Sequence, residues 1–113
     1  MSSTIIKINL YIFLALLTLF PASLSWSRSV TDELGRSVNI SPRVQRIVSL
    51  APGITETLYA LGLEDKIVGV TTFCDWPVRA SEKEKVGGFI NPSLEKTVSL
   101  SPDLILATAD GNR

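Results

Sequence analysis

Three bulky aromatic residues in one irregular stretch, residues 72–91, are the side chains best suited to bind a ligand. They are Phe73, Trp76 and Phe89. Aromatic side chains in a loop offer flat apolar surface, which favours flat or macrocyclic apolar ligands. The alternative is that these rings only cap the apolar core beneath them. The pattern therefore predicts a ligand-binding wall, with core packing as the competing interpretation.

Few other residues in this sequence could do chemistry. The 113 residues include no His, so a Ser-His-Asp triad, an imidazole base and a His-ligated zinc site are excluded. Cys74, the one cysteine, either is a small buried side chain or pairs with a cysteine beyond residue 113. A nucleophilic thiol would need a neighbouring base or cation, whereas Asp75 follows it. The zero net charge argues against binding nucleic acid through a basic face.

The first residues are typical of an export signal. Lys7 precedes an apolar run at residues 10–20, and the small residues Ala22, Ser25 and Ser27 follow it. The run has 11 residues, whereas a membrane-spanning helix needs roughly 20. An uncleaved anchor is the alternative. We expect residues 1–27 to be a signal peptide that is removed after Ser25 or Ser27, and residues 28–113 to form the folded part.

Strand patterns recur along residues 28–113. Residues 30–33 and 36–40 predict a hairpin that turns at Leu34-Gly35, because glycine accepts a positive φ at little cost. Compact apolar runs at residues 46–50, 66–71 and 103–108 predict three buried strands.

Two helices are expected between these strands. The first spans residues 54–61 and ends at Gly62. The second begins with Asn91 as N-cap and Pro92 as the first helical residue, and runs to about residue 100. Its spacing places Leu94 and Val98 on the buried face.

Strands that alternate with helices indicate βαβ units. Runs that are apolar on both faces need cover on both sides of the sheet. We therefore expect an α/β fold: an open parallel sheet with flanking helices, preceded by a β-hairpin. Ligands of such sheets bind outside the carboxyl ends of the strands, which here are residues 50–55, 71–77 and 108–113.

From about residue 30 to residue 112, the sequence resembles the N-terminal lobe of the periplasmic substrate-binding proteins of ABC importers for vitamin B12, haem and iron-siderophores. The motifs that carry the likeness are TDELGRSVNI at 31–40, QRIVSLAPGITETLYALGLEDKIVGVT at 45–71, FCDWP at 73–77, VGGFINPSLE at 86–95 and SLSPDLILA at 99–107. Each motif is weak alone. Their order and spacing behind an export signal make the resemblance specific.

The resemblance implies a protein of two lobes that are joined by a rigid helix and hold the ligand between them. This chain would be about half of one lobe, and we expect it to be a fragment of a longer reading frame. The whole protein would capture a cobalamin or an iron chelate in the periplasm and deliver it to a permease in the inner membrane. It would catalyse nothing, hold no cofactor or metal of its own, and be a monomer.

The resemblance also assigns roles to residues. FCDWP and VGGFINPSLE are most similar to the B12-binding members, in which one aromatic of each segment contacts the corrin ring. Phe73 and Phe89 occupy these positions, where the B12-binding protein has Tyr and Trp. Trp76 belongs to the same wall. Iron-siderophore members more often use Arg or Tyr against the charge of the ligand, and Arg79 could serve, so a ferric siderophore or haem is the alternative ligand.

Glu95 matches an acidic residue that meets arginines of the permease in this family. The alternative needs no partner, because a carboxylate in the first turn of a helix is stabilised by roughly 0.3–1 kcal/mol through the helix dipole.

Two other classes of function stay open at this point. A secreted α/β hydrolase or oxidoreductase would need a His residue, a G-x-S-x-G motif or a G-x-G-x-x-G motif. None of these is present in the sequence. An extracytoplasmic sensor or adhesion domain could use the same fold, since a fold does not fix a function.

Overall fold

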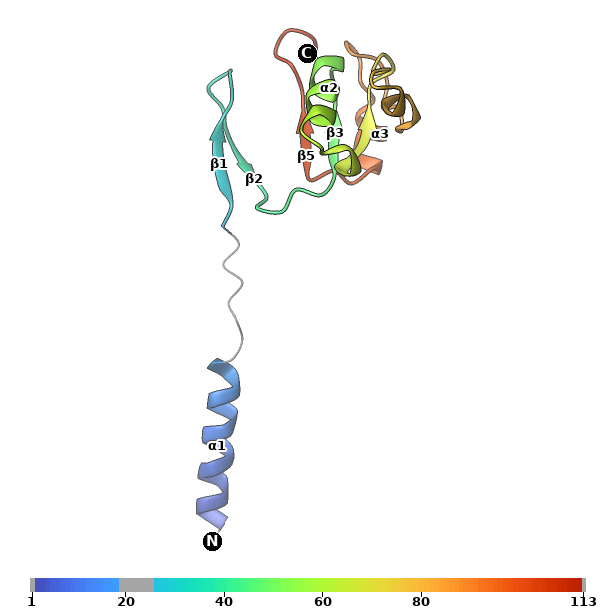
Figure 1. Ribbon diagram of the computed structural model, residues 1–113. Coiled ribbons are helices and arrows are strands. Elements are labelled where there is room, and N and C mark those ends of the chain that lie inside the picture. Colours follow the sequence, from blue (N-terminus) through green and yellow to red (C-terminus); the bar gives the residue numbers. More distant parts are fainter. Residues whose placement is uncertain (1, 19–25, 113) are drawn as a thin grey trace.

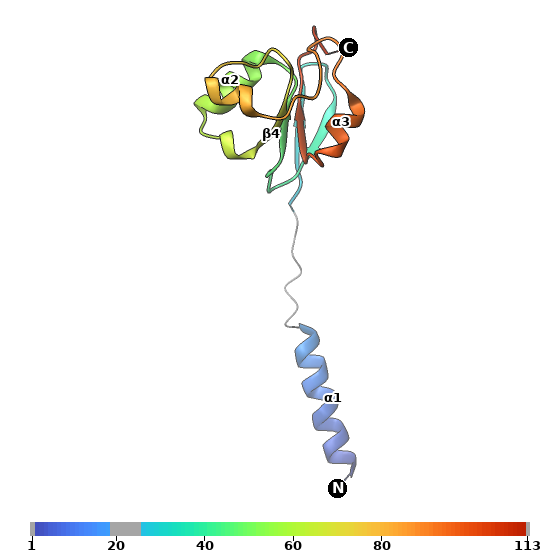
Figure 2. The same ribbon diagram turned by 90° about the vertical axis from the view of Figure 1, so that its right-hand side faces the viewer.

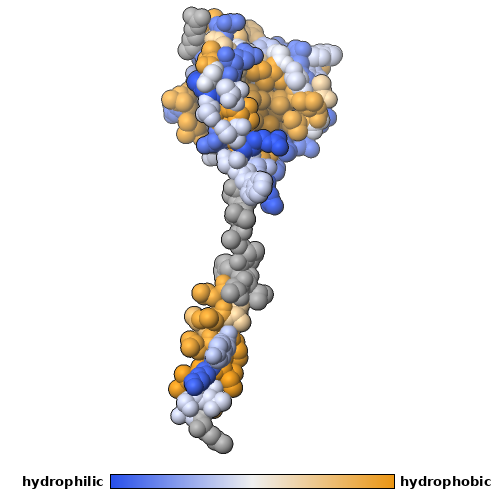
Figure 3. All heavy atoms as spheres, turned by 90° about the vertical axis from the view of Figure 1, so that its left-hand side faces the viewer, coloured by the Kyte–Doolittle hydropathy of each residue, from blue (hydrophilic) through white to orange (hydrophobic). Residues whose placement is uncertain are grey.

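The computed structural model describes residues 2–18 and 26–112 (Figure 1). Helix α1 (Ser2–Thr18) includes residues 10–18 of the apolar run in the predicted export signal. Its apolar side chains are exposed along its length, and Figure 3 shows apolar atoms over most of its surface. No helix in these two described ranges has the length and apolarity needed to cross a membrane. The predicted exit from the signal, residues 19–25, lies outside the described residues, so the signal peptide stays a prediction.

The first sheet is the expected hairpin, β1 (Arg28–Thr31) antiparallel to β2 (Ser37–Ile40). The predicted turn is confirmed, because Gly35 has a φ of 75°. The first strand ends two residues earlier than predicted, since the carboxylate of Asp32 organises the turn. It accepts the N–H groups of Leu34 and Arg36 at 2.9 and 2.8 Å and pairs with the Arg36 guanidinium at 2.6 Å.

The second sheet has three parallel strands, and each lies within a predicted run. They are β3 (Ile47–Ser49), β4 (Ile67–Val70) and β5 (Leu104–Leu106), in the spatial order β4-β3-β5. The chain passes from β3 to β4 through α2 (Pro52–Ala60) and returns to β5 through α3 (Leu94–Ser99). The winding direction therefore reverses beside β3. Such a reversal is where α/β sheets bind ligands, and Figure 2 shows α2 and α3 on opposite sides of the strands.

Helix α2 begins two residues before its predicted start. Pro52 takes the first helical position, where its missing N–H leaves no hydrogen bond unmade. The predicted end is confirmed, because Gly62 has a φ of 73°. The N–H groups of Gly62 and Leu63 donate to the carbonyls of Tyr59 and Leu58, both at 3.0 Å. This pair of bonds is a Schellman motif, which satisfies the last carbonyls of the helix.

Helix α3 begins later than predicted. Its N-cap is Ser93, whose hydroxyl accepts the N–H of Lys96 at 3.3 Å. The prediction of Asn91 as N-cap and Pro92 as first helical residue was wrong. Pro92 instead pairs with Gly87 in a β-bridge, so the chain is still extended at that point.

The buried face of α3 also differs from the prediction. Leu94 and Val98 were expected to be buried but are 77% and 63% exposed, and Thr97 is buried instead. The apolar contact with the sheet comes from Leu100, just after the helix. Leu100 fits because Gly69 has no side chain: a Cβ there would lie 2.6 Å from Leu100 Cδ1.

The core lies on both faces of β3, as the apolar runs predicted. The cluster on the α2 side consists of Ile47, Leu58, Ile67, Val70 and Cys74. The cluster on the α3 side consists of Val48, Leu50 and Val86.

Asp103 ties β3 to β5 at their amino ends. Its carboxylate accepts the N–H groups of Gln45 and Arg46, both at 2.9 Å. The Arg46 guanidinium in turn donates to the carbonyl of Leu100 at 2.7 and 2.9 Å. The two backbone bonds, that of Gln45 first, hold the pKa of the Asp103 carboxyl below its usual value of 3.8.

We expect Asp103→Asn to lower the free energy of unfolding at pH 7, because an amide has one oxygen to offer where the carboxylate offers two. A carboxyl whose folded-state pKa is depressed stabilises the fold above its unfolded pKa, and this contribution is lost as the pH falls through the folded pKa. The difference between wild type and variant, measured by urea unfolding, should therefore narrow below about pH 4.

Asp110→Asn is the matched control for this experiment. Asp110 is exposed and forms no side-chain hydrogen bond among the described residues, so this change should affect stability little. If the difference in free energy of unfolding between wild type and Asp103→Asn stays constant from neutral to acidic pH, the stabilising role of the Asp103 carboxylate is contradicted.

Candidate functional site

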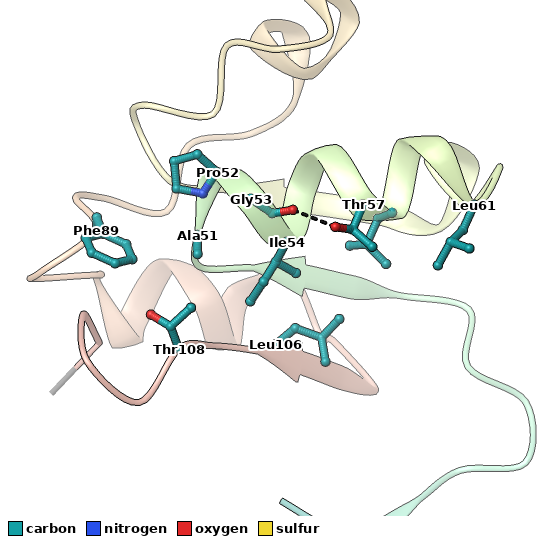
Figure 4. Close-up of a pocket in the computed structure, with 10 residues that line it drawn as sticks. Ala51, Pro52, Gly53, Ile54, Thr57, Leu61, Phe89, Leu106 and Thr108 are labelled. Carbon is teal, nitrogen blue, oxygen red and sulfur yellow. Dashed lines mark hydrogen bonds between the residues drawn. The ribbon is translucent and has the colours of Figure 1, made fainter. Parts of the chain in front are cut away.

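An apolar cavity of about 580 Å³ opens at the carboxyl ends of β3 and β5 (Figure 4). This volume lies in the range of small-molecule sites. The cavity is bordered by the turn into α2, one face of α2, the end of β5 and the loop around residue 89. Its lining residues are Ala51, Pro52, Gly53, Ile54, Thr57, Leu58, Leu61, Phe89, Leu106 and Thr108.

The lining is apolar except for two threonine hydroxyls. Figure 4 shows Ile54 of α2 directed toward Leu106 of β5. The hydroxyl of Thr57 is already engaged, since it donates to the carbonyl of Gly53 at 2.8 Å (dashed line in Figure 4). The cavity can therefore hold apolar ligand surface by contact, and offers few polar groups to orient it.

Phe89 is the member of the predicted aromatic wall that lines this cavity. Its half-buried ring lies against the backbone of Gly111, so close that a Cβ on Gly111 would overlap the ring. Glycine is needed at this position because only a residue without a side chain allows so close an approach. The loop after β5 thus determines where the ring of Phe89 sits.

Phe73 and Trp76 lie in the loop after β4, outside the cavity. Their side chains are 69% and 66% exposed, so neither caps the core. Trp76 borders a different hollow, beside α2, and a cis peptide bond joins it to Pro77. The structure therefore does not bring the three aromatics into one site. Phe89 faces the cavity, and Phe73 and Trp76 offer apolar area at the β4 end of the same sheet edge.

A buried network of three hydroxyls and a thiol lies beneath this edge. Thr55 is its centre: its Oγ1 lies 2.8 Å from Ser49 Oγ, 3.1 Å from the carbonyl oxygen of Ala51 and 3.2 Å from Cys74 Sγ. The hydroxyl of Thr71 contacts the same sulfur at 3.1 Å. Cys74 is free and buried, which agrees with its interpretation as a small buried side chain. The network joins β3, α2 and the loop after β4.

The charged and titratable groups near this edge do not line the cavity. Arg79 pairs with Glu64 at 2.8 Å. Burial raises the pKa of Tyr59, and the negative charge of Glu64 adds to the rise. The hydroxyl of Tyr59 is buried and has no hydrogen-bond partner among the described residues. Within residues 2–18 and 26–112, no three His, Cys, Asp or Glu side chains gather closely enough to hold a metal ion.

Glu95 lies on the first turn of α3, as expected for a presented carboxylate. It is exposed, and it forms no ion pair with another described residue.

Asn112 is a site residue that the sequence did not reveal. Its side-chain NH₂ donates to the carbonyl of Leu50, at 3.1 Å, and to that of Phe89. Its Oδ1 accepts the N–H of Thr108 at 3.0 Å. The sequence placed residues 108–113 at the ligand-binding edge, but nothing singled out Asn112 among them, because an Asn in an Asp-Gly-Asn turn is common in any loop.

The chain is similar to known proteins over the part that builds this site. Residues 47–113 match the family described as "Periplasmic binding protein". An uncharacterized ABC transporter substrate-binding lipoprotein of Bacillus subtilis, YvrC, is 47% identical over 79 residues, which are 70% of this chain and 25% of that protein.

Two solved structures are also similar. The periplasmic vitamin B12 binding protein BtuF of Vibrio cholerae is 46% identical with a TM-score of 0.59, over 62% of this chain and 28% of that one. A periplasmic heme binding protein from Pseudomonas aeruginosa is 31% identical with a TM-score of 0.60, over 63% of this chain and 25% of that one. The chain thus spans about a quarter of the length of these relatives. The likenesses confirm the expected fold class.

The buried network gives a prediction on stability. Thr55→Val keeps the shape of the side chain but removes three contacts of its hydroxyl. We expect it to lower the free energy of unfolding by about 1–3 kcal/mol, measured by urea unfolding, because buried polar partners lose a hydrogen bond.

The control is Thr57→Val, the same substitution two residues later. The Thr57 hydroxyl is exposed and makes one bond to a helix carbonyl, so the change should stay within about 0.5 kcal/mol. Equal losses for the two variants would show that the buried network adds nothing beyond an ordinary helix position.

Proposed function

Because the chain belongs to the periplasmic binding protein family, we propose that it is part of the substrate-binding component of an ABC importer. The protein captures a small metal-chelate ligand in the periplasm and delivers it to a permease in the inner membrane. The observation that carries this proposal is the apolar cavity at the carboxyl ends of β3 and β5, bordered by Phe89. Apolar surface at a switch point of the sheet suits a ligand with a large apolar body.

A corrinoid is the ligand that we propose first. The vitamin B12 binding protein of Vibrio cholerae is 46% identical to this chain, against 31% for the heme binding protein of Pseudomonas aeruginosa. Phe89 in the cavity and Phe73 on the exposed loop would contact the macrocycle, and Trp76 would extend this apolar area. Haem or a ferric siderophore is the alternative. Arg79, whose side chain is exposed, would then be the cation for a negatively charged ligand, after release from its pair with Glu64.

The remaining features of the proposal follow from the same family membership. Residues 1–27 serve as a cleavable signal peptide, and the exposed apolar side chains of α1 support this role. The protein works by binding and release, so it catalyses no reaction and needs no cofactor. It acts as a monomer toward its ligand.

The ligand assignment is tested by titrating the full-length protein with cyanocobalamin, hemin and ferrichrome. We expect Phe73→Ala and Phe89→Ala each to weaken binding of the cognate ligand by about 1–2 kcal/mol, or about 5- to 30-fold, through lost aromatic contact and buried area. Phe73→Ala should leave the midpoint of thermal unfolding nearly unchanged, because its side chain is 69% exposed.

Val98→Ala is the control for these variants. It removes exposed apolar area on α3, away from the cavity, and should change neither affinity nor stability. Unchanged affinity together with a large loss of stability in Phe89→Ala would show that this ring only packs the core. No binding of any of the three compounds to the wild type would overturn the metal-chelate proposal.

Glu95 is proposed to dock the permease. Its exposed carboxylate can accept two hydrogen bonds from a permease arginine. Glu95→Ala should leave ligand affinity intact and reduce permease-dependent uptake, and Glu95→Arg should reduce it further through repulsion of like charges. Because an exposed ion pair mainly affects the rate of association, the defect should shrink at high salt.

Ligand binding and uptake should be measured on the same preparation. Glu82→Arg is the matched control, since Glu82 is also an exposed carboxylate in a helical turn. Normal uptake with Glu95→Arg would mean that this carboxylate only stabilises its own helix.

A further inference from the structure

We propose that Asn112 is a positioning residue of the cavity, which holds Phe89 in its ligand-facing place. Its side chain bonds three segments that are far apart in the sequence: the end of β3 at Leu50, the loop at Phe89 and the turn at Thr108. Two of these residues, Phe89 and Thr108, line the cavity. The ligand-binding part of this inference rests on the proposed function, whereas its structural part does not.

The orientation of the Asn112 amide is determined by its partners. A carbonyl oxygen can only accept and a backbone N–H can only donate. The two carbonyls, of Leu50 and Phe89, must therefore face the NH₂ group, and the Thr108 N–H must face Oδ1. The amide uses both donors and its acceptor, so neither Asp nor Leu can replace it without loss.

Phe89 is held from two directions by consecutive residues. Gly111 lies against its ring, and Asn112 binds its carbonyl oxygen. If the Asn112 bond is lost, the loop around residue 89 loses its tie to β3. The aromatic ring can then leave the cavity wall without any change in the sheet.

The opposite end of the same strand pair provides a matched control. Asp103 precedes β5 and binds the backbone just before β3, at Gln45 and Arg46. It resembles Asn112 in linking β3 to the chain around β5 through a side chain, but it does so at the amino edge, away from the cavity. The substitution Asp103→Asn should therefore lower the free energy of unfolding without changing ligand affinity.

The decisive variant is Asn112→Asp in the full-length protein. It keeps an oxygen for Thr108 and replaces both donors with an oxygen that faces two carbonyls. We expect at least 10-fold weaker binding of cyanocobalamin, or of hemin if hemin is the compound bound by the wild type. Asp103→Asn should bind like the wild type.

A double variant tests whether the effect runs through Phe89. In a Phe89→Ala background, adding Asn112→Asp should weaken binding by less than about twofold, because the ring that Asn112 holds is already gone. A full 10-fold loss in that background would overturn the proposal, as would wild-type affinity in Asn112→Asp alone.

A measurement without ligand separates this inference from the proposed function. In the wild type, the ring current of Phe89 should displace the Gly111 Hα proton resonances from ordinary glycine values in the NMR spectrum, because the ring lies against this residue. Asn112→Asp should move them toward ordinary glycine values, while amide exchange stays slow at Val48 and at Leu104, whose N–H donates across the strand pair to the carbonyl of Arg46. If none of the ligands binds the wild type, the change in the Gly111 resonances between wild type and Asn112→Asp still tests the role of Asn112. Unchanged Gly111 resonances in the variant would overturn it.

Discussion

Strand β3 has no face open to water. Ile47 lies under α2, and Val48 is covered on the other side by Val86 and Leu100. Each fully buried aliphatic side chain of this kind contributes roughly 1.5–3 kcal/mol, so the two helical layers must stay on opposite faces. Only the ends of the strand are left for polar contacts and for a ligand.

The two ends of β3 are used differently. At the amino end, a carboxylate from the chain before β5 accepts two backbone N–H groups. At the carboxyl end, an amide from the chain after β5 donates to the carbonyl of Leu50, and the hydroxyl network around Thr55 closes the turn into α2. The carboxyl end is thus the more elaborate of the two. Its polar contacts leave a wall that is apolar toward the cavity.

Much of the fold could be predicted because it depends on local patterns. The strands are compact apolar runs, and Gly35 and Gly62 have the positive φ expected of turn and C-cap residues. The register of α3 could not be predicted from spacing. A six-residue helix has too few positions for a periodic signal, and its apolar contact comes from Leu100, outside the helix.

The location of the candidate site could be predicted from the sequence, but only some of its residues could. The carboxyl edge follows from the order of strands and helices, and Phe89 lies there. Gly111 and Asn112 were missed because their roles depend on partners 22 and more residues away, which no local pattern reveals. The exposure of Phe73 and Trp76 likewise depends on how the loop after β4 leaves the sheet.

The spatial order β4-β3-β5 has a consequence for how the chain folds. Ile47 pairs with Ile67 across 20 residues, but with Leu104 across 57. Closing the longer loop costs about 0.9 kcal/mol more in chain entropy, and contacts of low sequence separation form first. The entropy of loop closure therefore favours formation of the unit of β3, α2 and β4 before β5 joins it. The cavity is lined by Leu106 and Thr108 as well as by α2, so it takes shape only when β5 and the turn after it are in place.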